Sequence, residues 1–204
     1  MSRLLSLPLI VLIMGIGALA MLVPAFYAIS LKEWRIAHVF GVSAVLFGFL
    51  TCILGLALAN YRAPSQSRSH LAALVAAYTV LPLMLAVPFQ QGVASTTFTN
   101  AWFEMVSSMT TTGATLFEPD RLSPALHLWR ALVGWLGGFL AWVAAFALLA
   151  PMNLGGFEVI SSESVGAGVR PGAGRRYGNL SAGDPRERLL RVTLQLLPIY
   201  VSLT

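Results

Sequence analysis

Four long stretches without a charged side chain constrain this chain more than any other feature. No Asp, Glu, Lys or Arg lies between Arg3 and Lys32, between Arg35 and Arg62, between Arg68 and Glu104, or between Arg130 and Glu158. Each stretch can hold the ~20 apolar residues that cross a bilayer core of ~30 Å as a helix. A soluble helical protein would show polar faces at helical spacing instead. The pattern therefore predicts an all-α membrane protein with several transmembrane helices.

The few charges indicate membrane topology rather than nucleic-acid binding, and we expect a lipid bilayer as the surroundings and no nucleic-acid partner. Charged residues are 10% of the chain, against about 25% in soluble domains. If each stretch crosses once, nine basic residues fall on one side: Arg3, Arg62, Arg68, Arg170, Arg175, Arg176, Arg186, Arg188 and Arg191. Four fall on the other: Lys32, Arg35, Arg121 and Arg130. The positive-inside rule then predicts a cytoplasmic N-terminus.

Polar connections divide the chain into four expected segments. Residues 1–62 hold a leading pair of crossings, at 4–29 and 36–59. Residues 63–156 hold two more, at 71–89 and 125–149, after a polar loop over 60–70. Residues 157–188 are predicted to form a flexible cytoplasmic linker, because Gly, Ser and Arg dominate there. Residues 189–204 open another apolar run, predicted to be the truncated first helix of a further unit, so we expect the front part of a longer protein.

A half-length apolar segment lies between the third and fourth crossings. Residues 100–110 would make a helix of roughly 16 Å, which is half a membrane. That length indicates a re-entrant element or a buried core helix. Thr99 or Asn100 can cap its start, and Glu104 in the first turn suits the positive end of the helix dipole.

The segment runs into Thr110, Thr111, Thr112, Gly113, Ala114 and Thr115, which offer carbonyl and hydroxyl oxygens and no charge. Such oxygens replace the water shell of an alkali cation in a selectivity filter. Gly113 permits the backbone angles that point successive carbonyls one way, and the preceding helix aims its negative end at the same place. A Thr-Gly run also occurs in ordinary polar turns. The order of crossing, half-length helix, Thr-Gly run, return and crossing favours a cation pore.

Several motifs resemble the Trk/Ktr/HKT potassium transporter family. The run from Trp102-Phe103-Glu104 to Ser107, with residues 110–115, resembles the family's first pore loop. In TrkH-type subunits, similar motifs occur in the helix that follows and in a leading helix pair. Those motifs here are Leu128-Trp129-Arg130, Trp135-Leu136-Gly137-Gly138, Pro151 with Gly155-Gly156, and residues 21–25.

The resemblance implies a potassium uptake protein of the bacterial inner membrane, built of four helix–pore loop–helix repeats around one pathway. It implies a K+ site at Thr111, Thr112 and Gly113, with Ala114 as a further filter carbonyl. Thr110, Thr115, Glu104 and Asn100 would support the pore helix and mouth, although the family usually has Asp where Asn100 stands. The implied partners are the remaining three repeats of the same subunit, a second copy in a homodimer, and a cytoplasmic nucleotide-binding regulatory subunit. No organic cofactor and no enzymatic activity are implied.

Other readings stay open at this point. A sodium-permeable member of the same family and a non-conducting membrane anchor both fit one isolated loop. A membrane enzyme would need acidic, His or Ser groups clustered at one depth, which the sequence does not show.

Residues on the fourth crossing have alternative interpretations too. Gly134 and Gly138, with Gly137 beside them, can pack closely against the pore helix or simply bend their own. Arg130 either pairs with Glu118 or Asp120 at the pore mouth or snorkels to the membrane surface.

Overall fold

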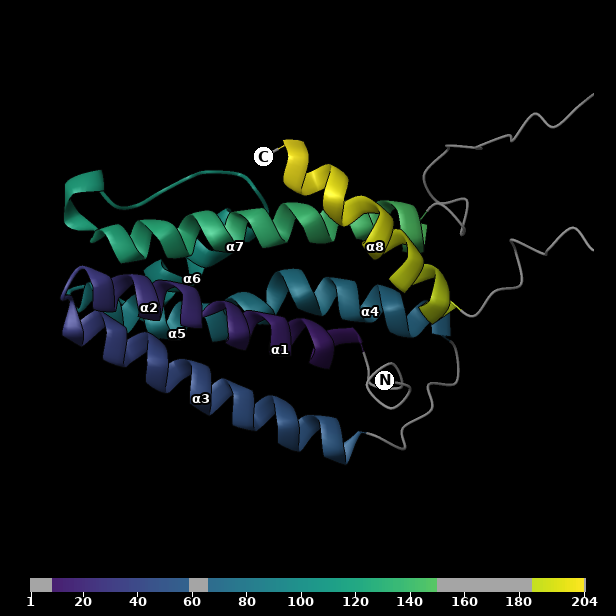
Figure 1. Cartoon of the computed structure of the whole chain (residues 1–204), viewed down its shortest axis with the longest axis horizontal. Helices are drawn as coiled ribbons and strands as arrows, with labels where there is room; N and C mark the ends of the chain where they lie inside the picture. The colour runs from purple at the N-terminus through teal and green to yellow at the C-terminus, as the bar shows by residue number, and fades with distance from the viewer. Residues whose placement is uncertain (1–8, 59–65, 150–184, 204) are drawn as a thin grey trace, which may run out of the picture. The chain divides into compact units, whose positions relative to one another are not determined.

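The computed structural model describes residues 9–58, 66–149 and 185–203, and every regular element in these ranges is a helix. Four apolar helical stretches among them are long enough to cross a membrane, so the prediction of an all-α, multi-pass membrane protein is confirmed. The chain divides into two compact units, residues 1–141 and 142–204, which we describe separately. Figure 1 labels the helices in chain order.

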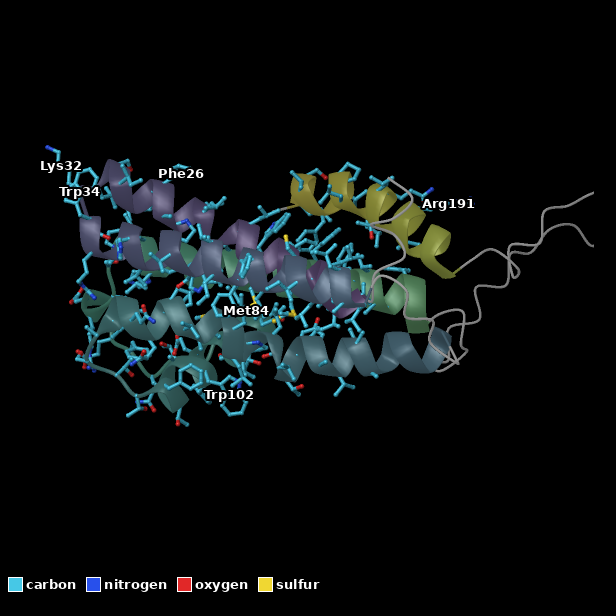
Figure 2. The ribbon with its side chains drawn as sticks, turned by 90° about the horizontal axis from the view of Figure 1, so that it is seen from below. Phe26, Lys32, Trp34, Met84, Trp102 and Arg191 are labelled. Carbon is cyan, nitrogen blue, oxygen red and sulfur yellow. The ribbon has the colours of Figure 1, made fainter. Side chains whose placement is uncertain are left out.

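The leading pair of crossings is present. Helices α1 (Leu9–Ala20) and α2 (Leu22–Ser30) together form a first stretch of 22 residues, and α3 (Trp34–Ala57) forms the second with 24. The first stretch is interrupted at Met21. Pro24 explains the interruption, because it has no N–H for the carbonyl of Ala20 and its ring crowds that carbonyl. In Figure 2, Lys32 and Trp34 mark the turn between α2 and α3.

The third crossing runs further than predicted. It consists of α4 (Gln66–Thr79) and α5 (Leu81–Val93), interrupted at Val80 just before Pro82. The predicted loop at residues 60–70 is wrong for 66–70, which already belong to α4, and the predicted end at residue 89 is four residues short. Arg35 stabilises the longer α5, donating hydrogen bonds to the carbonyls of Gln91 (2.8 Å) and Gly92 (2.5 Å). Cationic donors suit the negative end of a helix.

The half-length helix α6 (Phe98–Met109) and the short helix η2 (Pro119–Arg121) separate the third crossing from the fourth. The fourth consists of α7 (Pro124–Val143), continued by the π-helical turn η3 (Ala144–Leu149). Its apolar span is Pro124–Phe146. Figure 1 shows the chain after α6 returning without helix toward the end of the bundle where α7 begins.

The core of the first unit contains buried residues from α1, α2, α3, α5, α6 and α7. Phe40 and Trp129 are fully buried and form an edge-to-face pair with ring centroids 5.4 Å apart. The indole N–H of Trp129 donates to the carbonyl of Leu85 at 3.3 Å. Large apolar side chains also cover the outside, including Phe26, which projects from α2 in Figure 2, and Phe49 on α3. An apolar outer surface is what a lipid-facing helix needs.

In the second unit, η3 packs against α8 (Pro185–Leu203), and Trp142 and Tyr200 form an edge-to-face ring pair at 5.7 Å. The linker prediction for 157–188 is wrong for 185–188, which are helical. The rest of that linker, residues 157–184, lies outside the described residues, as do Pro151, Gly155 and Gly156.

Candidate functional site

Helix α6 begins at Phe98, two residues before the predicted start at residue 100. Thr97 is the N-cap, and its side chain accepts a hydrogen bond from the backbone N–H of Asn100 at 3.3 Å. Neither Thr99 nor Asn100 is the cap, since both lie inside the first turn. The first turn contains no acidic residue. The prediction that Glu104 serves the helix dipole there is therefore wrong, because Glu104 lies in the second turn.

The chain turns sharply where α6 ends. We call residues 110–115 the Thr-Gly loop. The backbone N–H groups of Thr111 and Thr112 donate to the carbonyls of Ser108 and Ser107, both at 3.0 Å. Gly113 has a φ of 76°, a left-handed angle that residues with a side chain resist, and Thr111 has a φ of 56°. For a β-branched residue such a φ is strained, by about 1–2 kcal/mol.

Three consecutive carbonyls of the Thr-Gly loop are available to a ligand. Those of Thr111, Thr112 and Gly113 accept no hydrogen bond from any residue that the structure describes. The side chains around them are exposed, and a Cβ added at Gly113 would meet open space. The carbonyl of Ala114 differs, because the Ser107 hydroxyl donates to it at 2.6 Å. Ala114 thus ties the loop back to α6.

The threonine hydroxyls of the loop bond mainly to one another and to nearby backbone. Thr110 Oγ1 donates to the carbonyl of Val106 at 2.8 Å and lies 2.8 Å from Thr112 Oγ1. Thr111 Oγ1 donates to the carbonyl of Thr110 at 2.7 Å. These bonds fix the hydroxyls locally, so the unbonded carbonyls are the stronger candidates for ligands.

The chain leaves the Thr-Gly loop through residues 116–118, which we call the returning limb. The fully buried carboxylate of Glu104 holds its start: Oε2 accepts the backbone N–H of Leu116 at 3.2 Å. The other oxygen, Oε1, lies 2.7 Å from Nη2 of Arg130 on α7. Arg130 therefore turns inward to Glu104. Both predictions for Arg130 are wrong: it neither pairs with Glu118 or Asp120 nor snorkels to the membrane surface.

The rest of the returning limb is anchored by aromatic packing. Phe117 is buried and meets Phe89 of α5 edge to face, with ring centroids 5.6 Å apart. The guanidinium of Arg121 lies 5.7 Å from the centre of the Phe117 ring and donates to the carbonyl of Ser95 at 2.9 Å. The limb is thereby fastened to the segment that precedes α6.

Glycines on α7 let the C-terminal end of α6 approach closely. A Cβ at Gly137 would overlap the Met109 carbonyl, and one at Gly134 would lie 3.3 Å from the carbonyl oxygen of Ser108. These two glycines on α7 are three residues apart, whereas the predicted small-residue pair was Gly134 and Gly138, four apart. Tyr78 donates to the carbonyl of Gly137 at 3.0 Å and braces the same point.

Some predicted residues stand apart from these contacts. Asn100 takes part through its backbone only, in the Thr97 cap. Thr115 bonds locally, its hydroxyl lying 3.2–3.3 Å from the backbone of Phe117. Gly138 lies on α7, next to Gly137. In Figure 2, Trp102 projects outward from α6, and it is exposed.

The assembled features define a class of protein: a multi-pass helical membrane protein with a half-length helix that ends in a loop of free carbonyls. TrkI of Halomonas elongata, a Trk system potassium uptake protein, is 38% identical over 91 residues, which are 44% of this chain and 17% of that protein. TrkH of Escherichia coli K12 is 33% identical over 141 residues, or 68% and 27%. TrkG of the same strain is 30% identical over 154 residues, or 73% and 31%.

The chain belongs to the Trk family. The matched parts are less than a third of each of these relatives' length. No protein-family model matches the chain.

Proposed function

We propose that this chain contributes one selectivity-filter loop to a potassium uptake pore in the bacterial inner membrane. Backbone carbonyls of Thr111, Thr112 and Gly113 replace the water shell of the ion as it passes. The membrane potential drives entry, at about 2.3 kcal/mol per unit charge for 100 mV. The relatives named Trk system potassium uptake proteins support potassium as the cargo.

One observation carries the proposal: after the C-terminal end of a half-length helix come three successive carbonyls that accept no hydrogen bond within the described part of the chain. Unpaired backbone carbonyls away from water are costly, so a structure that keeps them has a ligand or water for them. The negative end of α6 points toward the same loop and adds to the attraction for a cation. An uncharged oxygen set with this electrostatic bias suits a monovalent ion that must also leave again.

The length of α6 also supports a pore within the membrane. Helix α6 has 12 residues, roughly 18 Å at 1.5 Å per residue, which is too short to cross. We place it as a re-entrant helix that dips into the membrane from the side where α5 ends. Non-helical backbone at that depth is tolerated only where protein or water covers it. The exposed face of the Thr-Gly loop therefore fits a water-filled pathway shared with other loops of the same kind.

The proposed setting follows the family. Three further helix–pore loop–helix repeats of the same subunit would complete the ring, with the N-terminus in the cytoplasm as the charge distribution predicts. A second copy of the subunit and a cytoplasmic nucleotide-binding regulatory subunit are the further partners we propose. The role is transport rather than enzymatic catalysis.

The test is Gly113→Ser in the intact protein as its gene encodes it. Serine at a φ of 76° costs about 1–2 kcal/mol, so the loop relaxes and its carbonyls turn. We expect the ratio of potassium to sodium uptake, measured with rubidium-86 and sodium-22, to fall. Gly48→Ser is the matched control, since a Cβ at Gly48 meets nothing within 4 Å. An unchanged uptake ratio in Gly113→Ser would count against the filter. If the wild-type protein takes up sodium in preference to potassium, sodium would be the transported ion.

A further inference from the structure

The buried carboxylate of Glu104 has a different partner on each oxygen, a hydrogen bond on Oε2 and an ion pair on Oε1. Leu116 N–H donates to Oε2 at 3.2 Å, and the Arg130 guanidinium lies 2.7 Å from Oε1. The two partners come from different parts of the chain, the returning limb and helix α7. The carboxylate is fully buried and Arg130 is only 20% exposed, so solvent screens the pair weakly. Glu104 thereby links three elements at one point behind the Thr-Gly loop.

Only a carboxylate satisfies this arrangement. A carboxylate has two acceptor oxygens, whereas the amide of Gln has one acceptor and one donor group. With Gln at position 104, the ion pair with Arg130 is lost, and one of the two partners faces the amide NH2 in place of an oxygen. Arg130 also supplies a positive charge that offsets the cost of burying the carboxylate.

The returning limb depends on this bond at its first residue. The side chain of Leu116 is 53% exposed and so gives the backbone little packing of its own. The nearest other tie toward the filter is the Ser107–Ala114 bond, and the nearest away from it is buried Phe117. Without the carboxylate, the backbone between Ala114 and Phe117 loses its anchor at Leu116, three positions after Gly113. Selection among alkali ions depends on the number and direction of the carbonyls, so small movements there matter.

We infer that Glu104 and Arg130 are a pair of positioning residues that set the cation selectivity of the Thr-Gly loop by fixing the backbone at Leu116. The inference rests on the proposed function and adds to it, because neither residue touches the ion. Arg130 acts through Glu104, and Glu104 acts through the Leu116 N–H. The pair therefore governs the choice of ion more than the amount of protein or the maximum rate.

The experiment measures potassium and sodium uptake for Glu104→Gln, Arg130→Gln and Arg130→Lys in the intact protein, together with the amount of each variant in the membrane. Glu104→Gln and Arg130→Gln are expected to lower the potassium-to-sodium uptake ratio about tenfold, which corresponds to about 1.4 kcal/mol. Arg130→Lys keeps the charge and is expected to retain the ratio to within about twofold. Glu118→Gln removes an exposed carboxylate two residues beyond Leu116 and is expected to leave the ratio unchanged.

Two results would overturn the inference. One is a wild-type uptake ratio in both Glu104→Gln and Arg130→Gln. The other is a loss of membrane protein in both with no change in ratio for the molecules that remain, which would mean a merely structural pair. If Glu104→Gln does not reach the membrane, the contrast between Arg130→Gln and Arg130→Lys decides in the same way.

The failure of this inference is distinguishable from failure of the proposed function. If Gly113→Ser lowers the ratio while the Glu104 and Arg130 variants do not, only the positioning role fails. If Gly113→Ser leaves the ratio unchanged, the filter itself fails.

Discussion

Gly137 lies where the fourth crossing meets the end of the half-length helix, and Gly137→Ala probes that contact directly. A Cβ there would lie 2.7 Å from the carbonyl carbon and 2.8 Å from the Cα of Met109. Ordinary contacts begin near 3.4 Å, and the Met109 carbonyl oxygen would lie closer still, so the backbone of Met109 must move to admit the methyl group. No flexible side chain can absorb that shift, because the obstructing atoms are backbone.

The expected cost follows from this overlap. Overpacking of this kind costs about 1–3 kcal/mol, while Gly→Ala within a helix gains up to about 1 kcal/mol. Gly41→Ala is the matched control, since a Cβ at Gly41 meets nothing within 4 Å. We therefore expect Gly137→Ala to be about 1–3 kcal/mol less stable than Gly41→Ala. Gly134→Ala should fall between them, because its Cβ would lie 3.3 Å from the Ser108 carbonyl oxygen.

The assay is thermal unfolding of the intact protein in detergent, together with the potassium-to-sodium uptake ratio. Gly137→Ala should unfold at a lower temperature than Gly41→Ala and should also lose selectivity, because Met109 directly precedes the Thr-Gly loop. Equal unfolding temperatures for the two variants would show that α6 does not pack on α7 as described. Lower stability with an unchanged uptake ratio would mean that the position of α6 does not determine the ion selectivity of the Thr-Gly loop.

Two further predictions concern the two ends of α6. Thr97→Ala removes the N-cap hydrogen bond from the Asn100 N–H and should lower the free energy of unfolding by about 1 kcal/mol. Thr97→Ser keeps a hydroxyl at the cap and should keep the stability of the wild type. Equal stability of the Ala and Ser variants in detergent would refute the cap. Ser107→Ala removes the donor to the Ala114 carbonyl, so it should lower the free energy of unfolding by about 0.5–1.5 kcal/mol and reduce the potassium-to-sodium uptake ratio. Ser202→Ala is the control that should leave the ratio unchanged, because the Ser202 hydroxyl donates to the carbonyl of Ile199 within α8.

The crossings could be predicted from the sequence because lipid imposes one strict requirement. Stretches of ~20 apolar residues without charge have few alternatives to a spanning helix. The interruptions at Met21 and Val80 were not predicted, although Pro24 and Pro82 are the cause. A proline can be tolerated near the end of a helix or can break it, and the neighbouring packing decides between these outcomes.

The half-length helix and a backbone angle at Gly113 that residues with a side chain resist could also be predicted, since length and the Thr-Gly run are local signals. The contacts that individual side chains make with distant residues could not be predicted. Glu104 and Arg130 are 26 residues apart, and nothing in the sequence prefers Glu104 over Glu118 or Asp120 as the partner of Arg130. The contact becomes apparent only when α7 lies against α6, which in turn depends on Gly137. The Ser107–Ala114 bond was missed for a related reason, because Ser107 reads as an ordinary polar residue on a helix.

The most direct measurement is anomalous X-ray scattering from rubidium, used in place of potassium, in crystals of the intact protein. The account predicts anomalous density beside the carbonyl oxygens of Thr111, Thr112 and Gly113, on an axis shared with other pore loops, and its loss when sodium replaces rubidium. Density elsewhere, with these three carbonyls turned toward lipid or bulk water, would contradict the account.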